Sequence, residues 1–405
     1  MRIFAVVAAL IVALSSTAAA AAAPAKAGEA AGKTRVIVLG VDHGTQLVSR
    51  NDQPGMLTAF LDQVRPDAIC IERPPEQAAR GDYYEYTYEV QGVILPYAAR
   101  THTALCPIDW MPPVEDQKLG FGLDLDTPLE LRRPNGFQGF LSFPEANAIQ
   151  RDFFAADDPA NLARVVQWAA TPAPAASQDL PRRLYLYRTF MQAQRIRAAA
   201  AARPGKTVLV VIGYFHKPDI EANLAKDPAI DLVQPSSLGR PDPAAVAAAT
   251  TTEQLAAILA FNLLGVQADS GNVDWAWVAD VLAQMEQRQP GPATSLLRIR
   301  YDLLTGTIDP AKAARRYAAL AADTPDDARF AWTGVEDKSR VDSFFDPFGN
   351  LSVRQRALVE QARCLFAQGQ IRSGDALIET VARTLPKRQA FQLTGYAARL
   401  HPKKG

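Results

Sequence analysis

Two histidines follow two apolar runs at the same spacing. Gly40-Val41-Asp42-His43 ends the run that begins at Val36, and Gly213-Tyr214-Phe215-His216 ends the run that begins at Val208. Runs so rich in β-branched residues are typical of strands that are buried on both faces. We expect each glycine to let the chain turn off its strand. Each histidine is therefore predicted just beyond the carboxyl end of a strand, where ligands bind in open parallel sheets.

Two further apolar runs end on carboxylates. Glu72 follows Ala68-Ile69-Cys70-Ile71, and Asp109 follows Ala104-Leu105-Cys106-Pro107-Ile108. Two imidazoles with one or two carboxylates form a ligand set that suits Zn²⁺, Mn²⁺, Co²⁺ or Fe²⁺. The same groups could instead act as general base and acid in a hydrolase without a metal. The residues alone leave both alternatives open.

Segments with helical spacing separate these runs and must position them. Helices are expected at about residues 54–64, 83–100, 182–202 and 218–224, and a last strand at 230–233. Strands and helices that alternate with short connections imply right-handed crossovers and a parallel sheet. The predicted fold over residues 34–240 is thus α/β, with a mostly parallel sheet and flanking helices. An insertion at about 114–180, helical near 160–170, is expected to cap the strand ends.

Residues 241–405 are predicted to form a second, all-helical domain, because they are rich in alanine and contain no convincing strand. Within it, Tyr301–Ile308 and Ala362–Ile371 share a helix, Gly, x, Ile, helix layout that resembles tetratricopeptide hairpins. Two copies are too few to define a solenoid. Trp332–Asn350 lies between them, and we interpret it as a packing segment between the domains, with a binding loop as the alternative.

The amino terminus has the pattern of a secretory signal. Met1-Arg2 precedes an apolar run from Ile3 to Leu14 and an alanine tract, so residues 1–23 are predicted to be a signal peptide that is cleaved among Ala18–Ala23. The run is shorter than the roughly 20 residues that a membrane-spanning helix needs. We expect a periplasmic or secreted protein with no transmembrane segment after cleavage.

Composition narrows the classes of function. The chain has 43 Lys and Arg against 43 Asp and Glu, and without a basic field nucleic-acid binding is not expected. Its three cysteines are an odd number, which excludes a fully paired disulfide framework. Cys70 and Cys106 lie in apolar runs and are expected to be small buried hydrophobic residues, with a disulfide as the alternative.

The motifs resemble those of the TIKI/TraB superfamily, which also takes in erythromycin esterase-like and ChaN-like proteins. The resemblance rests on Gly40–His43, on Pro66-Asp67-Ala68-Ile69-Cys70-Ile71-Glu72-Arg73 and on Gly213–His216, and it covers about residues 34–236. It implies that the paired glycine-x-x-histidine turns and the strand-end glutamate form the site. It also implies an arginine from the helix before the last motif, for which Arg188 is the best match. Members of the superfamily look like metal-dependent proteases, hydrolyse esters or bind haem.

We therefore expect an exported α/β hydrolase that acts on a peptide or ester bond of a peptide or small-molecule substrate. His43, Glu72 and His216 would bind a divalent metal or share the proton transfers. Asp109 would be a further ligand or orient a histidine, while Arg73 and Arg188 would steady an anionic intermediate. One alternative is an exported protein that binds haem or a metal complex without catalysis. Another is a degenerate α/β scaffold whose helical domain recruits a protein partner.

Overall fold

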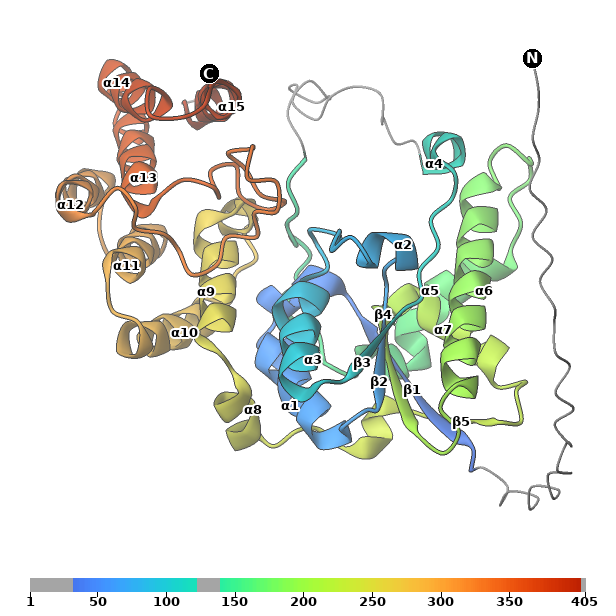
Figure 1. The fold of residues 1–405 in the computed structure, drawn as a ribbon. Coiled ribbons are helices and arrows are strands. Elements are labelled where there is room, and N and C mark those ends of the chain that lie inside the picture. Colours follow the sequence, from blue (N-terminus) through green and yellow to red (C-terminus); the bar gives the residue numbers. More distant parts are fainter. Residues whose placement is uncertain (1–31, 122–138, 402–405) are drawn as a thin grey trace, which may run out of the picture.

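A five-stranded parallel sheet forms the centre of the computed structural model, which describes residues 32–121 and 139–401 (Figure 1). The strands are β1 Thr34–Val41, β2 Ala68–Ile71, β3 Ala104–Pro107, β4 Thr207–Gly213 and β5 Ile230–Val233. Their order across the sheet is β3-β2-β4-β1-β5. The prediction of a parallel α/β fold followed by a helical region is confirmed. The predicted signal peptide lies outside the described residues.

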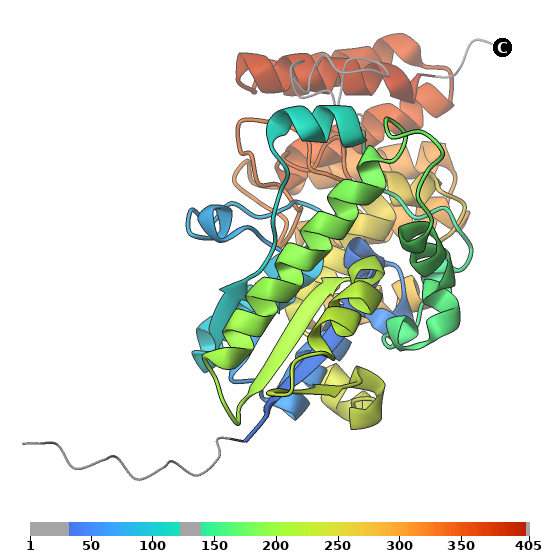
Figure 2. The same ribbon diagram turned by 90° about the vertical axis from the view of Figure 1, so that its right-hand side faces the viewer.

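Helices cover both faces of the sheet. On one face lie α1 (Pro54–Val64) and α3 (Leu95–Thr101), and on the other α6 (Leu180–Ala201) and α7 (Lys217–Leu224) (Figures 1 and 2). Alternate residues of a strand point to opposite faces. In β1, Ile37 therefore joins the core under α1, whereas Val38 joins the core under α6 and α7. Burial on both faces explains why the inner strands β1, β2 and β4 appear in the sequence as nearly continuous apolar runs.

The helix expected over residues 83–100 is only partly correct. The chain is mostly irregular up to Tyr88, forms a π-helical turn over Glu89–Ile94, and only then continues as α3. Pro96 has no amide proton, so regular α-helical bonding cannot run through it. The amide of Leu95 instead donates to the carbonyl of Val90, five residues earlier. This wider turn sets the position of Glu89.

Three further helices lie in the connections around the strand ends. They are α2 (Pro75–Ala78), α4 (Val114–Phe121) and α5 (Pro159–Ala170). Helix α5 matches the helical part that was predicted for the insertion, and it packs beside α7 and the Tyr214–His216 turn. The described part of the insertion thus lies next to the second histidine.

The chain beyond the sheet is helical. It contains α8 Pro243–Ala249, α9 Thr252–Leu259, α10 Trp275–Arg288, α11 Pro292–Leu304, α12 Pro310–Asp323, α13 Val353–Ala367, α14 Ile371–Ala382 and α15 Lys387–Ala397. Both segments that were compared with tetratricopeptide hairpins connect two successive helices, α11 to α12 and α13 to α14. Gly306 and Gly369 close α11 and α13, each with a φ of 75°, a backbone conformation that favours glycine.

The Trp332–Asn350 segment packs rather than extending from the surface. The ring of Trp332 stacks on Phe345 at 5.3 Å and meets Tyr88 edge-on at 5.3 Å. Tyr88 precedes the π-helical turn of the sheet-containing part, so the segment joins the helical region to it.

Among the described residues no single helix has the length and apolarity to cross a membrane, although Pro243–Ala249 and Thr252–Leu264, bent by 92°, meet the criteria as a pair.

Candidate functional site

Glu72 lies between the two motif histidines. Its Oε2 is 3.8 Å from Nε2 of His43, and its Oε1 is 3.7 Å from Nε2 of His216. The strand order explains this arrangement. Because β4 pairs with both β1 and β2, the residues that follow these three strands meet at one edge of the sheet.

His216 is fully buried and has one unpartnered nitrogen. Its Nδ1 lies 2.6 Å from the hydroxyl of Thr189, and that hydroxyl donates its only proton to the carbonyl of Tyr185 at 2.8 Å. The hydroxyl must therefore accept from Nδ1, which assigns the proton of the neutral ring to Nδ1. Nε2 then carries a lone pair, and it has no hydrogen-bond partner. Burial, together with the positive charges of Arg188 and His43, lowers the pKa of His216 well below its ordinary value.

His43 has the opposite electrostatic environment. Its Nδ1 donates to Glu89 Oε1 at 2.8 Å. Burial alone would lower the pKa of His43, but the charge and hydrogen bond of Glu89, helped by Glu72, raise it to about 9. The backbone of His43 has a φ of 42°, a left-handed conformation that costs a non-glycine residue about 1–3 kcal/mol and is often found at functional sites.

Both carboxylate oxygens of Glu72 accept hydrogen bonds. Oε1 accepts from Arg188 at 2.8 Å, and Oε2 accepts from the backbone amide of Gly213 at 2.7 Å. Burial raises the pKa of Glu72, while Arg188 and His43 oppose that shift. Glu72 therefore takes up a proton more readily than a surface glutamate, and it is held in place from two sides.

Asp109 fixes Arg188 and contacts neither histidine among the described interactions. The guanidinium of Arg188 donates to Asp109 at 2.6 and 2.7 Å. Gln192 and Tyr84 also donate to this carboxylate, at 2.8 and 2.9 Å. The expectation that Asp109 orients a histidine is therefore wrong in this geometry, because its oxygens are occupied by other donors. Its role is to hold the arginine that holds Glu72.

Arg73 does not reach the site. Its guanidinium donates to Asp82 at 2.6 Å and lies 3.8 Å from the centroid of the Tyr84 ring. The chain bends directly after β2, where the amide of Arg73 donates to the carbonyl of Ile71 at 2.8 Å. The Arg73 side chain turns toward Asp82, whereas that of Glu72 faces the histidines. The expectation that Arg73 steadies an anionic intermediate is corrected accordingly, since Asp82 already compensates its charge.

Neighbouring atoms approach the two motif glycines closely, and neither glycine has the positive φ of a tight turn. Gly213 has a φ of −49°, and Gly40 is not among the described residues with positive φ. A Cβ added at Gly213 would lie 3.2 Å from both Glu72 Oε2 and His43 Nε2, and one added at Gly40 would lie 2.6 Å from Cβ of Ala156. The expected turning role is thus corrected: both positions lack room for a side chain.

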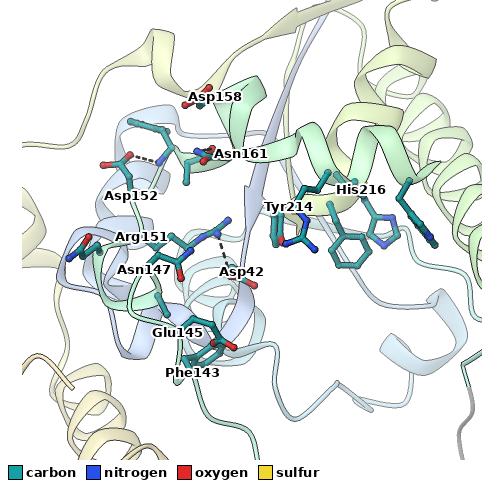
Figure 3. A pocket seen from close by; sticks show the side chains of 18 of the residues that line it. Asp42, Phe143, Glu145, Asn147, Arg151, Asp152, Asp158, Asn161, Tyr214 and His216 are labelled. Carbon is teal, nitrogen blue, oxygen red and sulfur yellow. Dashed lines mark hydrogen bonds and ion pairs between the residues drawn. The ribbon is translucent and has the colours of Figure 1, made fainter. Parts of the chain in front are cut away.

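A cavity of about 1400 Å³ opens beside His216 and Arg188. Its walls come from the described part of the insertion, from α5 and α6 and from the Tyr214–His216 turn, and they include Phe143, Arg151, Asn161, Arg164, Trp168 and Tyr185. Figure 3 shows Arg151 reaching toward Asp42 on one side and His216 beside Tyr214 on another. His43 and Glu72 are not among the residues that line this cavity. The ring of His216 is itself shielded by Tyr185 and Phe215, at centroid distances of 5.3 and 4.2 Å.

Sequence reasoning did not identify Glu89 or Thr189. Glu89 lies in the π-helical turn, and its orientation toward His43 depends on a backbone irregularity that hydrophobic spacing does not encode. Thr189 follows Arg188 directly in the sequence, but only the packing of α6 against the Tyr214–His216 turn shows that its hydroxyl meets the imidazole. Both residues orient a predicted site residue through its second nitrogen.

The donors at the site, two imidazoles and a carboxylate, are of the types that divalent metals prefer. The Nε2 atoms of His43 and His216 both face Glu72, and each Nδ1 is held by an acceptor, as is usual for metal-binding histidines. The lack of a hydrogen-bond partner for Nε2 of buried His216 also favours its use as a metal ligand. No group of three or more His, Cys, Asp or Glu side chains within residues 32–121 and 139–401 is gathered closely enough to hold an ion. Binding would require Glu72 to exchange its bond with Arg188 for the metal.

Comparisons with protein-family models, with curated proteins and with solved structures found no match to this chain.

Proposed function

We propose that the protein is an exported hydrolase of the TIKI/TraB type, which cleaves a peptide or ester bond at the edge of the sheet where His43, Glu72 and His216 meet. The observation that supports this most directly is the unpartnered Nε2 of His216. A buried polar atom without a partner is costly, and here it carries a lone pair beside a large cavity. A lone pair in that position is suited to accept a proton from a water molecule.

The two histidines are suited to opposite steps. His216 is held neutral, so its Nε2 acts as the general base toward the attacking water. His43 has a pKa of about 9 and therefore carries a proton near neutral pH, which it can give to the leaving group. A base and an acid that flank one carboxylate, with pKa values displaced in opposite directions, are the usual arrangement for acid–base hydrolysis.

Arg188 and the residues around it are positioned to assist the acid–base pair of His43 and His216. Arg188 lines the cavity and is anchored by Asp109 and Glu72, so its guanidinium is fixed where negative charge develops on the substrate. Because Tyr185 and Phe215 shield His216, a substrate reaches Nε2 only after these rings shift. In the alternative that uses a metal, His43 would first lose its proton; a divalent metal held by His43, Glu72 and His216 would then polarise the scissile carbonyl and acidify a bound water.

The cavity favours an extended substrate. Its volume of about 1400 Å³ exceeds the roughly 300–1,000 Å³ of ordinary small-molecule pockets. Its lining combines aromatic residues with charged residues of both signs, including Trp168, Arg164 and Asp158. Such a lining suits a peptide segment with mixed side chains better than a compact ester.

The test is an assay of the purified mature protein against peptide and ester panels, with and without chelator, alongside a measurement of bound metal. His216→Ala and His43→Ala should each lower turnover by about 10²–10⁴-fold. The matched control is His401→Ala, which removes a more exposed histidine that pairs with Asp375 at 2.9 Å and should leave turnover unchanged. An intact fold with no turnover of any substrate would contradict the proposal. A Soret band on haem titration that His216→Ala abolishes would favour the binding alternative.

A further inference from the structure

Cys70 and Cys106 face each other across two neighbouring strands. They are direct partners in the parallel register of β2 and β3, where strands lie about 4.8 Å apart. That spacing falls within the Cα separation of about 4.4–6.8 Å found in disulfides. Both side chains pack into the same apolar cluster beneath α6, so they project from the same face of the sheet. Both are free thiols in the structure.

The two sulfurs differ in access. Cys70 is fully buried, whereas Cys106 is only partly buried and belongs to β3, which is an edge strand. A reagent from solution therefore meets Cys106 first. A hydrogen bond from Cys70 also lowers the pKa of Cys106 to about 7, which increases the fraction of thiolate, the form that attacks disulfides.

We propose that Cys70 and Cys106 are a reversible dithiol–disulfide pair that closes across β2 and β3 in response to a disulfide oxidant. The Cys106 thiolate attacks one sulfur of the oxidant and releases the other as a thiolate. The Cys70 thiol then attacks Sγ of Cys106 in the mixed disulfide, and it expels the second half of the oxidant, which takes up the proton of Cys70. Two protein thiols are oxidised, and one disulfide of the oxidant is reduced to two thiols.

The position of the two cysteines in the sheet connects them to the candidate functional site. Glu72 lies two residues beyond Cys70, and Asp109 lies three residues beyond Cys106, and these two carboxylates hold Arg188 between them. A bond between the cysteines would fix the spacing of the two strands directly below this anchor. The chemistry of the pair itself does not depend on the proposed hydrolase function.

The test uses the full mature chain, first reduced and then incubated with oxidised glutathione. Thiols are counted after unfolding, and the intact mass is measured. We expect two of the three thiols to disappear together, the mass to fall by two hydrogen atoms, and peptide mapping to join Cys70 to Cys106. Cys364 lies in α13, on the helical side, and Cys364→Ser should behave in the same way while leaving no thiol after oxidation.

The variant Cys70→Ser separates the two steps. It should stop at a stable glutathione adduct on Cys106, because the resolving thiol is missing. The proposal is overturned if the wild-type chain keeps all three thiols under conditions in which Cys106 of Cys70→Ser is modified, or if the wild-type chain also stops at the adduct. Retention of the wild-type circular dichroism spectrum shows that each form is folded.

Discussion

Thr189 determines which nitrogen of His216 carries the proton. Its hydroxyl is committed to the carbonyl of Tyr185, so it can only accept from the imidazole. This leaves Nε2 free as a base or as a metal ligand. A histidine of the other tautomer would present an N–H toward Glu72 and could do neither. One hydroxyl group therefore decides what the histidine can do.

We predict that Thr189→Val lowers kcat by about 10- to 100-fold with little change in KM, as is usual when the partner of a functional histidine is removed. Valine has nearly the same shape but cannot accept from Nδ1, so the tautomer is no longer fixed. Thr189→Ser retains the acceptor and should keep most of the activity. Nitrogen NMR of the His216 ring reports the tautomer directly. Wild-type kcat in Thr189→Val would show that Thr189 has no positioning role.

Gly213 offers a second test at the scale of single residues. A methyl group at Gly213 would press on both Glu72 and His43, each 3.2 Å from the new Cβ. We predict that Gly213→Ala lowers activity and destabilises the fold by about 1–3 kcal/mol, the usual cost of overpacking. Urea unfolding and turnover measure the two effects. Gly139→Ala is the control, because a Cβ there meets no described residue within 4 Å, and its stability should stay within about 0.5 kcal/mol of the wild type.

The sequence predicted which residues lie at the site better than it predicted what they do there. His43, Glu72, His216 and Arg188 could be found because each follows a recognisable strand or fits a motif. The roles of Arg73 and Asp109 could not, since they depend on which way a side chain leaves the strand end and on which donor reaches it first. Neither fact is encoded in the type of a residue.

At the scale of elements, α13 carries an unusual buried charge. Glu360 is fully buried and lies 2.9 Å from Arg356, 3.0 Å from Arg363 and 3.6 Å from Arg300. Burial alone would raise the pKa of Glu360, but the three arginines lower it to about 2. Arg356 also donates to the carbonyl of Leu264 at 2.8 Å, so this cluster connects α13 to the chain that follows α9.

The depressed pKa of Glu360 predicts a loss of stability in acid. An acid whose pKa is lower in the folded state stabilises the fold fully above its unfolded value of 4.5, and it loses that contribution as the pH falls toward 2. The shift corresponds to roughly 3 kcal/mol. Urea unfolding at pH 7, 4 and 3 should show stability decreasing over this range.

Glu360→Gln should remove that part of the pH dependence and cost about 3–5 kcal/mol at pH 7, because buried Arg300 and Arg356 and half-buried Arg363 lose their shared partner. The control is Glu379→Gln in α14, whose exposed ion pair with Arg383 spans 3.4 Å and contributes at most about 1 kcal/mol. Equal effects of the two substitutions would contradict the argument.

Elements were predictable wherever one local rule dominated. Strands β1 to β4 appear as apolar runs and β5 as three apolar residues around Asp231, while α1, α6 and α7 appear through helical spacing and prolines near their starts. The π-helical turn before α3 was not predicted. Its hydrophobic residues keep helical spacing, while the position of Pro96 changes the hydrogen bonding. Spacing alone does not distinguish an α-helix from a π-helical turn over six residues.

At the scale of the whole molecule, the sheet and the helical region share a core. One apolar cluster contains Ile37 of β1, Phe60 of α1 and Phe261 from the turn after α9. Polar contacts cross the same boundary: Asn262 donates to the buried carbonyl of Leu47 at 2.6 Å, and Gln254 donates to Thr58 at 3.0 Å. The sequence marks a change of composition near residue 241, yet composition does not show whether the two parts bury surface against each other.

We therefore predict that residues 34–240 do not fold stably alone, whereas the full mature chain unfolds in a single transition. Truncation would expose the face of α1 that α8 and α9 cover, and an apolar surface of that kind leads to aggregation. Circular dichroism melting and size-exclusion chromatography of both chains would measure this. Removal of residues 387–405 is the control: in the described part it takes away Leu393 and Tyr396, which belong to a separate cluster beside α13 and α14, so the core under the sheet stays covered. A monomeric 34–240 fragment with wild-type stability would instead show that the sheet needs no helical partner, and the helical half would then be free to bind another protein.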